Sequence, residues 1–208
     1  MLTSFGHRRG WIVAKGAVRA DAARNKEKIL AVARQCFAEQ GLEVSLDSVA
    51  KRAGVGAGTL YRHFPGREAL VAELLDAEMG ALEQNFVSLR DSDLRVEEKL
   101  ERWSHELRRW MTSYAGLPEP LREALDGGSG ALTVGCDVVI GWTEEIVQEA
   151  KAAGVVKDFV TGREFYRATL GLAWVATAAG VRGGAEADGL HRMAREGWAS
   201  PGRGTAPV

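Results

Sequence analysis

The sequence predicts an all-α protein with an N-terminal three-helix helix-turn-helix module and a larger C-terminal helical domain. Three observations support this fold class. Residues 41–64 read as two short helices joined by a glycine turn, later segments repeat apolar residues at helical spacing, and no segment shows the alternation of a strand. The 208 residues suffice for a small module and a domain with its own core.

We divide the chain into four segments. Residues 1–20 are expected to be a flexible basic arm, and residues 21–67 the helix-turn-helix module. Residues 68–199 are expected to form the C-terminal domain. Residues 200–208, which are rich in Pro and Gly, are expected to form a disordered tail.

Local signals mark both short helices of the module. Ser45 precedes an apolar pattern and suits an N-cap, and Asp47 places a negative charge in the first turn. Gly54 allows the positive φ that a tight turn between helices usually requires. Pro65 ends the second helix, because the residue before a proline is pushed out of the α region.

On a helical wheel, the second short helix has one apolar side, formed by Leu60 and Phe64, which must face the core. The positions left facing outward are Ala57, Gly58, Thr59, Tyr61, Arg62 and His63. Such a helix fits a major groove of DNA, with the Gly58/Arg62 face toward the bases and both flanks near phosphates. An ordinary pair of core helices is the alternative, but it does not explain why hydroxyl, imidazole and guanidinium groups gather there.

The segment from Gly54 to Leu70, GVGAGTLYRHFPGREAL, resembles the signature of the tetracycline-repressor (TetR) family. The residues that resemble that family's first helix are Ile29, Leu30, Ala33, Phe37 and Gly41. The resemblance covers about residues 22–75 and implies a DNA-binding module. It also implies contacts with the DNA backbone from Ser45, Thr59, Tyr61, His63 and Arg67, and a base contact from the position of Ala57.

Two residues depart from the family's pattern. Gly56 stands where Ser is frequent, and Ala57 stands where a polar or basic residue is frequent. Ala57 offers little beyond contact with a thymine methyl, whereas the guanidinium of Arg62 can pair with guanine O6 and N7. We therefore hypothesise that base readout shifts to Arg62, with a phosphate or solvent role as the alternative.

Charge is divided unevenly along the chain. Residues 1–67 carry 12 Lys and Arg against 5 Asp and Glu, a net charge of +7. Residues 68–208 carry 15 against 23, a net charge of −8. A basic end on an acidic body suits a protein that docks one end on a polyanion, although chance segregation is the alternative. The basic arm either lies along DNA or is a mere extension.

Several other classes of function find little support. Cys36 and Cys136 form no disulfide framework, and no cleavable signal sequence precedes them. The longest apolar stretch, residues 168–181, is too short and too rich in small residues to cross a bilayer. Glu101 and His105 have a spacing that suits a metal, but one such pair is weak evidence. Because no catalytic pair or phosphate loop stands out either, we expect a cytoplasmic protein that is not an enzyme and holds no cofactor or metal.

Apolar residues at helical spacing predict the helices of the C-terminal domain. A long connector is expected from Arg67 to about Leu89, and a second helix carries a stripe from Leu100 to Tyr114. Further helices are expected at about 118–126, 131–152, 159–181 and 186–198, with a glycine-rich loop at 127–130.

This domain carries aromatic and polar residues that are candidates for a small-molecule site. They are Trp103, Trp110, Met111, Tyr114, Asp137, Trp142, Phe165 and Trp174. An apolar, aromatic-lined cavity between helices is the usual form of such a site, and plain core packing is the alternative for each residue. Asp137 is the polar candidate, because a buried carboxylate needs a partner, unless it lies on the wet side of its helix.

The last two helices are expected to form a dimer interface. Small residues recur over residues 168–174, and the last helix has a stripe of Leu190, Met193, Ala194 and Gly197. For residues 168–174, packing within the chain is the competing role. With the resemblance, these features predict a homodimeric, ligand-responsive transcriptional repressor that binds an inverted-repeat DNA operator and is released by a small apolar or aromatic effector. The alternative is a regulator of the same fold that a protein partner controls without a small-molecule ligand.

Overall fold

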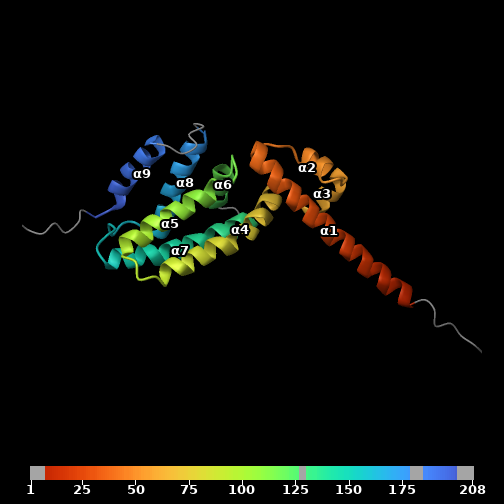
Figure 1. Ribbon diagram of the computed structural model, residues 1–208, viewed down its shortest axis with the longest axis horizontal. Coiled ribbons are helices and arrows are strands. Elements are labelled where there is room, and N and C mark those ends of the chain that lie inside the picture. Colours follow the sequence, from red (N-terminus) through yellow and green to blue (C-terminus); the bar gives the residue numbers. More distant parts are fainter. Residues whose placement is uncertain (1–7, 127–129, 179–184, 201–208) are drawn as a thin grey trace, which may run out of the picture.

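The computed structural model describes the backbone of residues 8–126, 130–178 and 185–200, and within these ranges it contains nine helices (Figure 1). The head consists of α1 (Arg8–Gln40), α2 (Leu46–Arg52) and α3 (Ala57–His63). The remaining helices are α4 (Arg67–Arg90), α5 (Val96–Met111), α6 (Pro118–Leu125), α7 (Ala131–Ala152), α8 (Gly162–Ala178) and α9 (Ala185–Trp198). In the described ranges, extended backbone pairs only in an isolated bridge between Val156 and Ala199. The predicted all-α fold is therefore confirmed.

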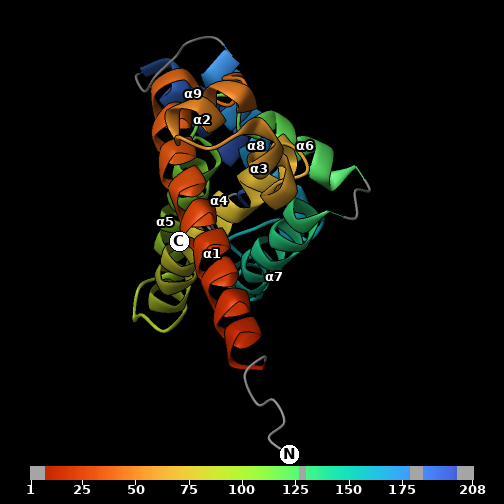
Figure 2. The same ribbon diagram turned by 90° about the vertical axis from the view of Figure 1, so that its right-hand side faces the viewer.

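The first helix is longer than the sequence analysis predicted. α1 begins at Arg8, so the described part of the expected flexible arm, residues 8–20, is helical. These residues contain no proline, and alanine recurs at every third position from Ala14 to Ala20, which favours helix. Figures 1 and 2 show this part of α1 projecting beyond the rest of the molecule. Residues 1–7 lie outside the described residues.

The local signals of the head act as predicted. The hydroxyl of Ser45 accepts a hydrogen bond from the backbone N–H of Ser48 at 3.2 Å and so caps α2. Gly54 has a φ of +67° in the turn between α2 and α3. α3 ends at His63, and Phe64 is extended before the proline.

α7 is the central helix of the body and packs against α4, α5, α6 and α8. Two buried polar contacts hold α5 against it. Trp103 Nε1 donates to Thr143 Oγ1 at 2.9 Å, and this hydroxyl donates to the carbonyl of Val139 at 2.8 Å. Lys99, which is also buried, forms an ion pair of 3.1 Å with Glu149. Both contacts give buried polar groups the partners that they require, so the α5–α7 packing is well defined.

The head and the body meet where the α5–α6 turn reaches the α1–α2 turn. The N–H of Leu42 donates to the carbonyl of Ala115 at 2.8 Å. The rings of Phe37 and Tyr114 meet edge to face, with centroids 6.2 Å apart. The Tyr114 hydroxyl donates to Glu78 on α4 at 2.7 Å, and burial raises the pKa of Tyr114 to about 12. A movement of the α5–α6 turn would therefore reach the head directly.

The body helices lie close to their predicted ranges. The helix expected at 159–181 begins at Gly162, whose backbone N–H donates to the carboxylate of Glu144 on α7. A side chain at Gly162 would collide with the backbone of Glu144, so this glycine lets α8 start in direct contact with α7. Most of the predicted loop at 127–130, the end of the helix expected at 159–181, and residues 201–208 of the predicted tail lie outside the described residues.

Candidate DNA-binding face and ligand pocket

α3 presents the faces that the helical wheel predicted. Leu60 and Phe64 are buried in the core of the head, whereas 45% of the Tyr61 side chain is exposed. The other positions predicted to face outward are exposed or half-buried: Ala57, Gly58, Thr59, Arg62 and His63. α3 therefore carries polar groups on faces that the core does not use.

The side chain of Arg62 lies back along its own helix. Its Nε donates to the carbonyl of Gly58 at 3.0 Å, and its Nη2 donates to Thr59 Oγ1 at 3.2 Å. Both hydrogen bonds are exposed, so water or another acceptor can replace them at little net cost. Arg62 would leave these contacts to read a base, and the guanidinium already lies on the Gly58/Arg62 face.

Arg67 and His63 have structural contacts besides the predicted contacts with the DNA backbone. Nη2 of Arg67 donates to the carbonyl of Val44 at 2.9 Å, which ties the start of α4 to the residue before the Ser45 cap. Nη1 of Arg67 is buried and has no hydrogen-bond partner among the described residues. His63 lines the pocket described below. For both residues, contact with DNA stays a prediction.

Lys51 is a further candidate for phosphate contact that the sequence analysis did not single out. It is exposed in the last turn of α2, and it has no ion pair within the described part of the chain. Its neighbour Arg52 is instead bound to Glu39 at 2.6 Å, so that guanidinium is already paired. Lys51 is absent from the motif that carries the resemblance, which is why the motif did not reveal it.

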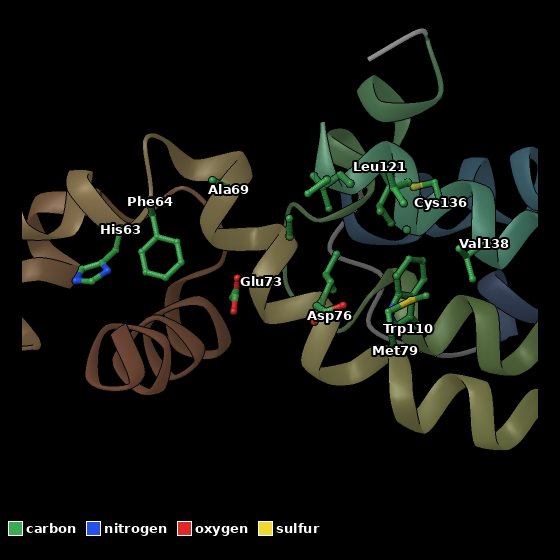
Figure 3. A pocket seen from close by; sticks show the side chains of 16 residues that line it. His63, Phe64, Ala69, Glu73, Asp76, Met79, Trp110, Leu121, Cys136 and Val138 are labelled. Carbon is green, nitrogen blue, oxygen red and sulfur yellow. The ribbon is translucent and has the colours of Figure 1, made fainter. Parts of the chain in front are cut away.

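A pocket of about 560 Å³ lies between the head and the body (Figure 3). α4, α5, α6 and α7 contribute to its wall, together with the end of α3 and Phe64. Apolar side chains dominate the wall, among them Leu75, Met79, Trp110, Leu121, Leu132 and Val138. Figure 3 shows His63 and Phe64 at one end of the pocket and Trp110, Cys136 and Val138 at the other. An occupant would therefore touch both the head and the body.

Comparison with known proteins shows which family the N-terminal part of the chain resembles. The family model described as "Bacterial regulatory proteins, tetR family" matches residues 29–74. The HTH-type transcriptional regulator SAB2452 of Staphylococcus aureus is 33% identical over 75 residues, which are 36% of this chain and 40% of that protein. The TetR transcriptional regulator SCO0520 from Streptomyces coelicolor is 28% identical and has a TM-score of 0.55 over 85% of this chain and 99% of that chain. The head of the protein therefore matches the helix-turn-helix module of the TetR family.

The similarity in sequence and the similarity in fold differ in extent. The aligned part spans only about 40% of the length of the curated relatives. Likeness in fold extends over the body: the fatty acid degradation regulator FadR from Bacillus halodurans is 20% identical, with a TM-score of 0.56 over 81% of this chain and 93% of that chain. At that identity the likeness shows the fold alone. The match in sequence therefore covers the head, which is similar to the helix-turn-helix module of transcriptional regulators.

Of the eight residues predicted to line a ligand site, Trp110 lines the pocket. Its side chain is 7% exposed, and its Nε1 has no hydrogen-bond partner among the described residues. Four others are buried in the core away from the pocket: Trp103, Met111, Tyr114 and Phe165. These four take the alternative role of plain core packing.

The remaining three residues also lie away from the pocket. The ring of Trp142 stacks on Phe86 with centroids 5.5 Å apart. Asp137 is exposed and forms an ion pair with Arg163 at 2.9 Å, so it takes the alternative position on the wet side of α7. Trp174 is 49% exposed on α8. Spacing along the helices did not distinguish these positions from the pocket, because it does not show which stripes other helices cover.

The sequence analysis missed most of the pocket wall. Val134 and Val138 lie one turn apart on α7 and are 64% and 42% exposed. Leu132, Cys136 and Val139 on the same helix are buried. Residues 131–140 thus carry more apolar side chains than one core-facing stripe needs, and this excess was the available signal.

The described residues offer no metal site and no membrane span. They contain no group of three His, Cys, Asp or Glu side chains that could hold a metal, and none of their helices combines the length and apolarity of a span. Glu101, which with His105 has a spacing that suits a metal, is bound to Arg195 at 2.6 Å. Cys36 and Cys136 are free and buried.

Proposed function

We propose that this protein is a homodimeric repressor of the TetR family in the cytoplasm, which binds an inverted-repeat operator through α3 and is released by a small apolar or aromatic effector. The observation that carries the proposal is the position of the pocket, between His63 and Phe64 of the head and α7 of the body. A ligand that prefers one arrangement of head and body shifts the equilibrium by the ratio of its affinities for the two states. Operator release then needs no contact between ligand and DNA.

Exposed apolar side chains on α8 and α9 support the proposed dimer. Trp174, Val175, Leu190 and Met193 are exposed on these two helices, which pack against each other. The other side of α8, including Leu170 and Ala173, is buried within the chain. Only one side of the 168–174 run is therefore available to a second copy, and four large apolar groups on adjacent helices suit such an interface.

Gly135→Leu should abolish release by the effector while operator binding is kept. Gly135 lines the pocket, and a Cβ there would meet no atom within 4 Å, so a larger side chain has open space at its base and should reduce the volume left for an effector. A leucine in place of glycine also favours helix, so α7 should stay folded. The operator is first selected from random DNA and labelled. Fluorescence anisotropy of the labelled operator then measures its release as the complex is titrated with each compound of an aromatic library.

Gly141→Leu is the matched control, because Gly141 lies on the same helix, has the same open space around its Cβ and does not line the pocket. Compounds that release the unaltered protein should also release Gly141→Leu. If both variants respond alike, the pocket is not the effector site and this part of the proposal is wrong. A selected operator without inverted symmetry would contradict the proposal that a two-fold symmetric dimer binds the DNA.

Arg62→Ala should relax preference at one base pair of each half-site, at a cost of about 1–3 kcal/mol in discrimination. Among the described residues, the exposed guanidinium is bound to Gly58 and Thr59 of its own helix, so its removal should leave the head folded. Tyr61→Phe gives the comparison, because loss of one phosphate contact should weaken all operators alike. Binding measured on a set of single-base operator variants separates these two patterns. Uniform weakening by Arg62→Ala would instead assign Arg62 to a phosphate.

A further inference from the structure

The charges on the pocket wall are of one sign. Glu73 and Asp76 on α4 line the pocket, and the described residues of its lining include no Lys or Arg. Glu73 is compensated, because its carboxylate forms an ion pair of 2.6 Å with Lys26 on α1. Asp76, one turn further along α4, is exposed and has no ion pair among the described residues. The wall therefore carries one negative charge without a counter-charge.

The rest of the wall favours an apolar, aromatic occupant. Leu75, Met79 and Trp110 come from α4 and α5, and Val134 and Val138 leave apolar surface exposed to water on α7. Covering this surface is favourable, at about 25 cal/mol per Å². The volume of about 560 Å³ falls within the range of about 300–1,000 Å³ that is typical of small-molecule pockets.

Together, these features point to one class of ligand. We infer that the pocket binds a hydrophobic organic cation, with Asp76 as the counter-charge of its positive group and the apolar wall around its body. The inference rests on the proposed function, because it names the effector class of that pocket. A carboxylate or phosphate ligand would place a second negative charge beside Asp76, and no Lys or Arg among the described lining residues could pair with it. Trp110 adds an aromatic side chain to the wall, and aromatic rings attract cations.

Two ions of nearly equal shape and opposite charge test this inference: tetraphenylphosphonium and tetraphenylborate. Titration calorimetry on the full chain should show the cation binding at least about tenfold more tightly than the anion. Asp76→Asn keeps the shape of the side chain and removes its charge. It should therefore lower the affinity for the cation by about threefold to fivefold, as expected for an exposed ion pair. Added salt should weaken cation binding to the unaltered protein and should affect the Asp76→Asn variant much less.

Asp93→Asn is the matched control, because it removes one exposed carboxylate from the α4–α5 connection, outside the pocket lining. It should leave the affinity for both probe ions unchanged. Val134→Lys introduces a positive charge at a pocket-lining position that is 64% exposed, so folding should tolerate it. This variant should bind the cation more weakly and the anion more tightly than the unaltered protein does.

The outcomes separate the ligand class from the proposed function. Equal or tighter binding of tetraphenylborate, or no binding of the cation at millimolar concentration, overturns the cation inference. If uncharged or anionic compounds still release the operator and Gly135→Leu blocks them, the effector function of the pocket stands without this inference. If Gly135→Leu changes neither probe binding nor operator release relative to Gly141→Leu, both proposals fail.

Discussion

Gly41→Ala should lower the free energy of unfolding by about 2–4 kcal/mol, because it adds backbone strain and a steric clash at the head–body contact. Gly41 has a φ of +75°, which favours glycine. A Cβ there would lie 2.9 Å from the carbonyl oxygen of Ala115 and 3.0 Å from its Cβ. Because Leu42 also donates to that carbonyl, the α5–α6 turn cannot retreat without losing a hydrogen bond. Urea unfolding of both proteins measures the difference.

Gly54→Ala separates strain from the clash. Gly54 has a φ of +67°, close to that of Gly41, but a Cβ there would meet no atom within 4 Å. It should therefore cost only the backbone strain, about 1–2 kcal/mol. Equal losses for the two variants would show that the α1–α2 turn and the α5–α6 turn are not in tight contact in solution.

The features that the sequence predicted well are those whose cause is local. The Ser45 cap, the Gly54 turn and the end of α3 before Pro65 each depend on residues within one or two helical turns. The buried and exposed faces of α3 follow from its period alone, as Leu60 and Tyr61 show. The start of α1 was missed because the basic composition of residues 1–20 is typical of a flexible arm. Basic composition does not itself prevent a helix, and no proline between Arg8 and residue 20 stops one.

The pocket could not be predicted from spacing, because its wall is assembled from distant segments. Trp103 and Trp110 lie two turns apart on the same stripe of α5, and both are buried. Trp103 meets Thr143 of α7, whereas Trp110 borders the pocket that α4, α6 and α7 also line. Their different roles depend on which side chains of other helices face them, and a one-dimensional pattern does not contain that information.

Leu190→Glu combined with Met193→Glu should convert the protein to a monomer and lower operator affinity by about 100-fold or more. Both side chains are exposed on α9, at 38% and 71%, so the chain itself should tolerate the change. In the proposed interface, however, the new carboxylates would be buried next to an apolar partner surface without counter-charges. Sedimentation velocity measures the assembly, and anisotropy of a full operator and a single half-site measures the binding.

The loss of affinity follows from the small size of α3. A seven-residue helix makes few contacts, so one head alone should bind DNA weakly. Two heads fixed in one dimer make the second contact intramolecular, and this gain disappears when the dimer dissociates. The double variant should accordingly bind a half-site as well as the unaltered protein does, because its head is unchanged.

Phe159→Glu provides the matched control. Phe159 is 67% exposed and lies before α8, and it is not one of the four residues of the α8–α9 apolar face, Trp174, Val175, Leu190 and Met193. The same change of apolar to acidic should therefore leave both assembly and operator binding intact. Dissociation by Phe159→Glu but not by the α9 variant would move the interface to the α7–α8 connection. If both variants stay dimeric with full operator affinity, Trp174 and Val175 on α8 remain as the exposed apolar candidates for the interface. Replacing these two residues by glutamate must then break the dimer, or the α8–α9 face is not the interface.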